Sequence, residues 1–167
     1  MRKSGQSRKK RADWLASRFE ENYLLYQYCF VEFFLEHLSD VSKAFKGDLQ
    51  QVLVLGLVGQ VRLNATKRAI MSGLDPAELE PSEAVISASR LADVSGIPRQ
   101  TVRRKLMLLE AVGWIAQAPD GGWYLTVDTE SREAPAKRDL DGLDQRARLR
   151  IARLVADLED VAKRSTL

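Results

Sequence analysis

The residues best placed to do chemistry lie in a short basic segment, "RQTVRRK", between Pro98 and Leu106. Arginine can make paired hydrogen bonds to guanine, glutamine can do the same to adenine, and hydroxyl or ammonium groups suit backbone phosphates. If the segment is helical, its first turn can reach base edges in the major groove of DNA. The side chains of this segment predicted to contact DNA are Arg99, Gln100, Thr101, Arg103, Arg104 and Lys105.

Other kinds of chemistry find little support in the sequence. Cys29 and His37 are the single cysteine and the single histidine, so neither an internal disulfide nor a multi-cysteine zinc site can form. The sequence holds no glycine-rich phosphate loop, no nucleophile paired with a base and no cluster of metal ligands. We therefore expect a protein that is not an enzyme and that uses no cofactor and no metal.

Length and charge set broad limits. The chain has 167 residues, enough for one compact domain with extensions or for two small domains. Its formal net charge of +3 is compatible with a nucleic-acid partner but does not require one. No apolar signal segment follows the basic N-terminus, and the longest apolar run, at 52–59, is too short to span a bilayer. These features predict a soluble cytoplasmic protein without a membrane partner.

The N-terminal part predicts a tail followed by one long helix. Residues 1–11 are basic and are expected to be disordered, serving either as a solubilising tail or as an arm that touches phosphates. Residues 12–46 predict a helix, because apolar residues recur at alternating steps of three and four. Nine of the twelve aromatic residues lie between Trp14 and Phe45. A stripe this wide needs a large partner surface, and a second subunit is the most economical one.

The C-terminal part predicts a linker and a second long helix. Residues 128–140 are polar and contain a proline, which is typical of a linker. Residues 141–167 predict a helix whose apolar positions form one seam with charges elsewhere. We expect this helix and the helix at 12–46 to be dimerisation helices.

Residues 47–127 are predicted to form the central domain. Asp48 and Gln51 have the spacing of a capping box, and they begin a core helix that ends near Ser72–Gly73. Asp75 predicts the cap of a short helix after it. The remaining predicted elements are a strand at 84–86, a helix capped by Ser87, a helix from Pro98 to about 111, and strands at 114–118 and 123–127.

The middle of this domain has the pattern of a helix-turn-helix. In "SRLADVSGIPRQTVRRKL", Ala92 supplies a small residue at the helix crossing, and Gly96 supplies a left-handed turn. Ile97, Val102 and Leu106 then face the core, which leaves the basic residues pointing outward. Ser87 and Ser89, at the start of the first helix, are predicted to add phosphate contacts through hydroxyls and free amides.

The stretch "LADVSGIPRQTVRRKLMLLEAVGWI", followed by "AQAPDGGWYLT", resembles the winged helix-turn-helix of bacterial transcription regulators of the MarR, IclR and GntR types. The resemblance covers about residues 84–126. The plan of the whole chain is most similar to the MarR group, in which N-terminal and C-terminal helices of two subunits interlock. The resemblance implies a mainly α, homodimeric, sequence-specific DNA-binding regulator of transcription, whose helix at about 98–111 enters the major groove of double-stranded DNA.

Three features depart from the MarR pattern. Residues 66–83 are longer than the usual connection, one C-terminal helix stands in place of the usual pair, and the wing tip at 119–122 holds no Arg or Lys. Asp120 in that tip would repel phosphate, so contact between the wing and DNA stays open. The alternative function is a winged-helix protein–protein adaptor that never reads DNA.

The sequence leaves open the role of Cys29 and the existence of an effector site. Cys29, with Tyr23, Tyr26 and Tyr28 nearby, is similar to the peroxide-sensing cysteine of some MarR-type regulators. The alternative interpretation of Cys29 is a small buried apolar residue. A small-molecule effector could bind between the aromatic stripe and the winged domain, although the sequence indicates no polar groups for it.

Overall fold

The computed structural model describes residues 2–80 and 83–164. Helices dominate these residues, and their two short strands pair with each other, which confirms the predicted mainly α class. The chain divides into two compact units: the first contains residues 2–40 and 143–164, and the second contains the described residues in between. Within the described residues, none of the helices combines the length and the apolar character needed to cross a membrane.

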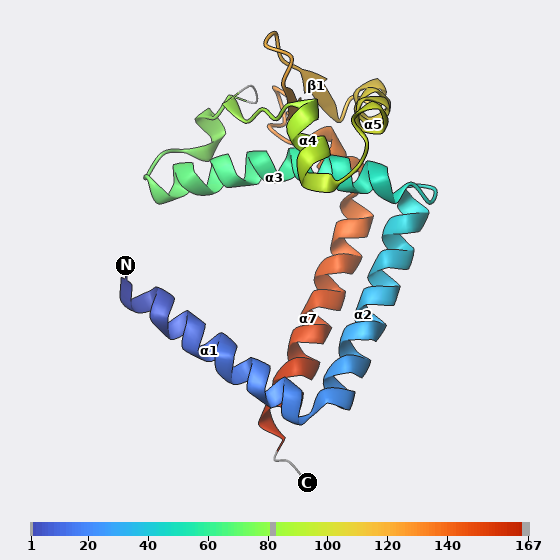
Figure 1. Cartoon of the computed structure of the whole chain (residues 1–167). Helices are drawn as coiled ribbons and strands as arrows, with labels where there is room; N and C mark the ends of the chain where they lie inside the picture. Colours follow the sequence, from blue (N-terminus) through green and yellow to red (C-terminus); the bar gives the residue numbers. More distant parts are fainter. Residues whose placement is uncertain (1, 81–82, 165–167) are drawn as a thin grey trace. The chain divides into compact units, whose positions relative to one another are not determined.

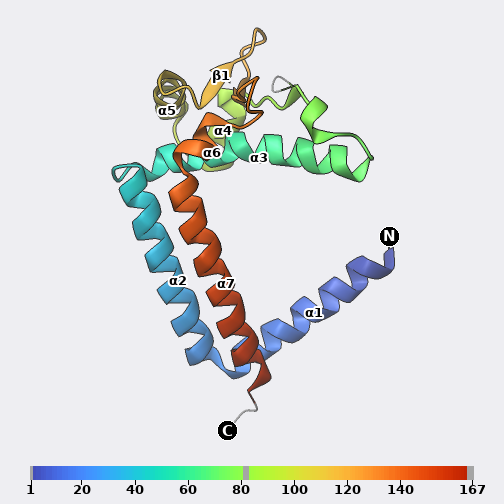
Figure 2. The same ribbon diagram turned by 180° about the vertical axis from the view of Figure 1, so that it is seen from behind.

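The first unit, as far as it is described, is built from α1 (Arg2–Glu21), most of α2 (Tyr23–Ala44) and most of α7 (Asp141–Lys163). The helices α2 and α7 lie side by side in Figure 1 and in the reverse view of Figure 2. Asp40 of α2 joins them, because its carboxylate accepts hydrogen bonds from Arg146 of α7 at 2.7 Å. Hydrogen bonds from Arg146 and from Arg150, also on α7, hold the pKa of Asp40 well below its usual range.

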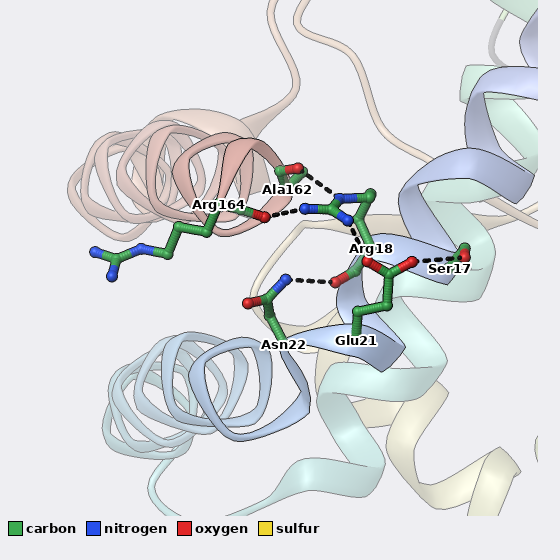
Figure 3. Close-up of polar contacts among 6 residues, drawn as sticks. All are labelled: Ser17, Arg18, Glu21, Asn22, Ala162 and Arg164. Carbon is green, nitrogen blue, oxygen red and sulfur yellow. Dashed lines mark hydrogen bonds and ion pairs between the residues drawn. The ribbon is translucent and has the colours of Figure 1, made fainter. Parts of the chain in front are cut away.

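The end of α1 is tied to the end of α7 by Arg18 (Figure 3). The Arg18 Nε donates a hydrogen bond of 2.9 Å to the carbonyl oxygen of Ala162, and Nη2 donates to that of Arg164. A cation at a helix C-terminus satisfies its last carbonyls and interacts favourably with the helix dipole. Arg18 also pairs with Glu21, which fixes the guanidinium in place.

Two expectations for the N-terminal part were wrong. The expected single helix at 12–46 is two helices that meet at Asn22. The side-chain amide and the backbone N–H of Asn22 both donate to the Arg18 carbonyl, and the Leu25 N–H bonds to the Asn22 carbonyl, three residues back instead of four. The expected disordered tail at 1–11 is, for residues 2–11, the first half of α1. Arg, Lys and Gln are good helix formers, and no proline interrupts this stretch. Met1 lies outside the described residues.

The C-terminal expectations were met in part. The last helix is confirmed over α7, whereas residues 165–167 of the predicted range lie outside the described residues. The expected linker at 128–140 contains a short helix, α6 (Pro135–Asp139). Pro135 stands in its first turn, where the missing N–H of proline costs nothing and its fixed φ favours a helix.

The second unit is built on α3 (Leu49–Met71), which supplies much of its core. The predicted cap is confirmed, since the Asp48 side chain accepts the Gln51 N–H at 3.0 Å, and the helix ends at Ser72 as expected. The short 3₁₀ helix η1 (Pro76–Glu78) follows, capped by Asp75. On α3 the side chains of Val54 and Val58 are fully buried.

The next two helices are α4 (Ala88–Ser95) and α5 (Arg99–Ala111), and their predicted boundaries are confirmed. The Ser87 hydroxyl caps α4 by accepting the Arg90 N–H at 3.2 Å. Gly96 ends α4 with φ of +69°, a left-handed conformation that glycine adopts without steric cost. The tight turn places α5 directly after α4 in the unit.

A small hairpin follows α5. Strands β1 (Ile115–Gln117) and β2 (Trp123–Leu125) pair antiparallel, with Gln117 opposite Trp123. The predicted strand at 84–86 is reduced to one bridge, between Ile86 and Trp123. The backbone of this segment runs close to the hairpin: a Cβ added at Gly122 would lie 2.9 Å from the Val85 Cβ. Only glycine fits at this approach without a shift.

The hairpin and α6 are joined to the rest of the second unit by Trp114. Its ring packs edge-on against Phe45, with centroids 5.9 Å apart. Its indole Nε1 donates a 2.9 Å hydrogen bond to Asp139, and this bond lowers the pKa of that carboxyl. Trp114 thus holds the start of the hairpin against Phe45 through its ring and against α6 through its indole N–H.

Candidate nucleic-acid interface

Helix α5 has one buried face and one exposed face. Val102, Leu106 and Leu109 have no exposed surface, so they fix the rotation of the helix against the core. Arg99 and Arg103, one turn apart, are exposed on the opposite face. Burial of three large apolar side chains is worth several kcal/mol, which makes the direction of the two arginines a consequence of core packing.

The exposed face of α5 borders a groove of about 510 Å³. This groove lies between the start of α4, one side of α5 and the β1–β2 hairpin. Its lining residues are Ser87, Ala88, Ser89, Arg99, Arg103, Met107, Glu110, Gln117, Gly121 and Trp123. Four of the eight residues predicted to contact DNA therefore meet in one hollow, although they come from two helices.

The other four predicted residues do not line this groove. Gln100 and Arg104 are exposed on α5 but do not line the groove. Thr101 is half-buried. In the first two turns of α5, Arg99 and Arg103 thus line the groove, whereas Gln100 and Arg104 are exposed outside its lining.

Lys105 was expected to face outward and reach phosphate, and the structure places it inside. Only 7% of the residue is exposed, and its ammonium is paired with the carboxylate of Asp48. Burial alone would raise the pKa of Asp48, but hydrogen bonds from Lys105 and from the Gln51 N–H lower it overall. The reason lies in the helical period: position 105 falls beside Leu106 and Leu109 on the core side, where a long lysine can reach Asp48.

The start of α4 brings further donors to the groove. The Ser87 hydroxyl oxygen already accepts the Arg90 N–H, and its own hydrogen remains available for donation. The first amides of a helix have no partner within the helix, and the dipole favours an anion there. Ser89 is half-buried in the same turn. These groups suit a phosphate oxygen better than a base edge.

The hairpin contributes shape to the groove but no positive charge. Residues 115–125 contain no Arg or Lys. At the tip, Asp120 folds back, and its carboxylate accepts the Gly122 N–H at 3.0 Å. The Gln117 side-chain amide donates to the Gly121 carbonyl at 3.3 Å, which stiffens the turn. All the positive charge lining the groove therefore comes from α5.

Six groove residues were not anticipated from the sequence: Ala88, Met107, Glu110, Gln117, Gly121 and Trp123. Helical spacing could have identified two of them, since positions 107 and 110 lie four and seven residues after Arg103 and share its face. Glu110 places a negative charge beside the far end of the groove. The positive part of the groove is thus limited to its Arg99–Arg103 end.

In the first unit, Cys29 is half-buried on α2. Burial raises the pKa of its thiol, and the nearby charge of Asp157 raises it further. A sensing cysteine needs a lowered pKa, because the thiolate is the reactive form. This environment disfavours the peroxide-sensor interpretation, which stays an untested prediction.

Comparisons of the chain with known protein families, with curated proteins and with solved structures found no match. Function must therefore be inferred from the chemistry of the chain itself.

Proposed function

We propose that the chain is a homodimeric, sequence-specific DNA-binding regulator of transcription. In this proposal α4, the Gly96 turn, α5 and the β1–β2 hairpin act as a winged helix-turn-helix. The observation that carries it is the groove in which Ser87, Ser89, Arg99 and Arg103 converge beside a helix locked by its buried face. Hydroxyls, helix amides and two arginines in one hollow match the chemistry of a DNA strand.

Helix α5 is the recognition helix in this proposal. Its exposed first turn would enter the major groove, which is wide enough for one helix. Arg99 and Arg103 would each bind a guanine edge through paired hydrogen bonds, and Gln100 would bind an adenine edge. The start of α4 would hold a phosphate, and Arg104 with Thr101 would contact the neighbouring backbone.

The hairpin acts as a brace for α5 rather than as a DNA contact. Its tip carries Asp120 and no cation, so it would be repelled by phosphates at short range. Its Trp123 is almost fully buried and pairs with Ile86, which anchors the hairpin to the segment before α4. The wing thus stabilises the groove without extending the footprint on DNA.

The first unit is proposed to supply the dimer contact. Helix α2 exposes a continuous apolar surface, and its rings form a ladder in which Tyr26, Phe30 and Phe34 follow one another at centroid distances of 6.1 and 6.0 Å. The large apolar and aromatic residues of α2 that are 40–79% exposed are Tyr23, Leu24, Leu25, Tyr28, Phe30, Val31, Phe34 and Leu35. A soluble monomer rarely leaves so large a patch uncovered. A second copy would cover it and place two recognition helices on half-sites one DNA turn apart, or a multiple of it.

The rival function is a protein–protein adaptor that uses the same fold. An adaptor would bind every duplex weakly and equally, and this binding would disappear as the salt concentration rises. Changing the arginines of α5 would then alter no preference for a DNA sequence. The arginines at the groove and the capped start of α4 favour DNA over this rival.

The test compares single arginine variants on duplexes selected by the protein from a random pool. Arg99→Ala and Arg103→Ala should each weaken binding by about 1–3 kcal/mol and relax the preference at one base position. Arg68→Ala removes an exposed arginine from the end of α3 and serves as the control. Selection of no sequence, or equal binding by all three variants and the unaltered chain, would refute the proposal.

A further inference from the structure

The first half of α1 carries a dense positive charge that the recognition helix does not use. Residues 5–11 read "GQSRKKR", and every one of them is exposed. Arg8, Lys9 and Lys10 have no acidic partner at ion-pair distance among the described residues. Arg11 has a single one, Glu159, at 4.0 Å, and both side chains are more than half exposed. An exposed pair at this distance contributes little to stability.

The four basic side chains surround the helix axis. Successive residues of an α-helix are about 100° apart, so positions 8–11 point in four directions that together span most of a turn. A single charged stripe would suit one line of phosphates. A helix charged on all sides suits the major groove, where phosphates of both strands flank it.

The chemistry of the segment favours nucleic acid over a membrane surface. A helix that lies in a lipid interface needs an apolar face beside its charged one. Residues 5–11 contain no apolar side chain, and the first exposed aromatic, Trp14, comes a turn later. The like charges at 8–11 repel one another, and phosphates would remove this repulsion.

We propose that residues 5–11 of α1 form a second DNA-binding surface, which grips the phosphates of double-stranded DNA without regard to base sequence. Arg8, Lys9, Lys10 and Arg11 are the contacting residues. The inference rests on the proposed function only in taking duplex DNA as the partner. It adds sequence-independent affinity to the base readout by α5 and enlarges the number of counterions released on binding.

The test measures affinity for a labelled 30-base-pair duplex of random sequence at several salt concentrations, with the full chain. In the test variant Arg8→Gln, Lys9→Gln and Lys10→Gln are combined. In the matched control Arg68→Gln, Lys43→Gln and Lys67→Gln are combined, which removes the same charge from exposed positions on other helices. Circular dichroism confirms that both variants keep their helices.

Removing three phosphate contacts should weaken binding on the order of a hundredfold at 0.1 M salt and reduce the slope of log K against log salt by about 2.7. The control should keep most of the affinity. The loss should be equal on random and on selected duplexes, whereas an Arg103→Ala change alters the preference between them. The unaltered chain could bind selected and random duplexes equally while the α1 variant still loses affinity. That result would refute base readout by α5 and support this inference.

Two results would overturn the inference. One is an equal loss of DNA affinity in the test variant and in the control, which would show that the affinity depends only on the net charge of the chain. The other is undiminished DNA binding by the test variant together with lost binding to vesicles of phosphatidylserine and phosphatidylcholine. That outcome would assign the segment to an anionic membrane surface.

Discussion

The two units of the chain bury their apolar residues very differently. The largest fully buried side chains among the described residues are Leu91, Leu106, Leu109, Ile115, Val54, Val58 and Val102, and all of them belong to the second unit. In the described part of the first unit, the buried residues are Val161 and Ala162. The second unit has a core of its own, whereas the first has apolar surface without a core.

Helices α5 and α2 show how strongly the stability of a helix depends on packing. Helix α5 is mostly polar, yet Val102, Leu106 and Leu109 tie it to α3, α4 and the hairpin. Helix α2 is far more apolar, yet none of its residues is fully buried. Since helices in proteins are stabilised mainly by packing of their apolar face, α2 needs a partner that α5 does not. This difference is consistent with the proposal that base readout belongs to the second unit and self-association to the first.

The largest expected effect is in the core of the second unit. Leu106→Ala should lower the free energy of unfolding by about 2–5 kcal/mol, because it leaves a cavity among fully buried side chains. Met107→Ala is the control on the same helix, since Met107 is 65% exposed and should change stability by less than about 0.5 kcal/mol. Urea unfolding of both variants measures the difference. Equal losses would mean that α5 is not held as described.

The first unit should respond in association rather than in folding. Phe34→Glu puts a charge into the exposed ring ladder of α2 and should raise the dimer dissociation constant on the order of a hundredfold, roughly 2–3 kcal/mol. Ile70→Glu changes an exposed apolar residue of α3 and should leave association unchanged. Sedimentation over a range of concentrations compares the two. A monomeric unaltered chain would remove the assignment of dimerisation to this unit.

Acid should weaken the second unit through Asp48. The pKa of this carboxyl is lowered in the folded chain by Lys105 and the Gln51 N–H, so its stabilisation is complete above the unfolded-state pKa. It is lost as the pH falls through the lower folded-state pKa. Asp48→Asn keeps a capping side chain but removes the charge, and it should cost about 1–3 kcal/mol near neutral pH.

The cost of Asp48→Asn should vanish in strong acid, where the carboxyl of the unaltered chain is protonated. Urea unfolding at a series of pH values measures this convergence. Asp75→Asn at the cap of η1 is the matched control, because the Asp75 carboxylate accepts only the Ala77 N–H among the described contacts. A cost of Asp48→Asn that is the same at every pH would show that the Lys105 pair contributes nothing.

The smallest effect is expected at the end of α7. Arg18→Lys keeps the charge but cannot donate to two carbonyls and Glu21 in the geometry of Figure 3, and it should cost about 1 kcal/mol. Amide hydrogen exchange near Ala162 should rise, while exchange in the second unit should not change. Arg148→Lys, at an exposed pair on the same helix, is the control. Unchanged exchange near Ala162 would mean that Arg18 does not hold this helix end.

Local signals in the sequence were sufficient for most of the second unit. Caps at Asp48 and Ser87, the glycine at 96 and the turn before Trp123 each have a short-range physical cause, and each is found where it was predicted. Lys105 was misplaced because its charge predicts exposure, while its partner Asp48 is 57 residues away. The break at Asn22 is a local change in backbone hydrogen bonding, which the spacing of apolar residues does not reveal.

The groove itself could be predicted only in part. The arginines of α5 follow from helical spacing, since residues that are not on the core face must face outward. Glu110 shares the helix face of Arg103, but Gln117, Gly121 and Trp123 join the groove because the hairpin folds back against the helices, and that contact is set by tertiary packing. Such tertiary contacts leave no local pattern to recognise.

The most direct measurement is a titration of the full chain against DNA from upstream of its own coding sequence and against random DNA, at rising salt. We predict a preference for the upstream duplex that persists as salt increases and that Arg103→Ala reduces, because base contacts are less screened than phosphate contacts. Equal binding to both duplexes that vanishes together with salt would contradict base readout by α5 and leave only charge attraction.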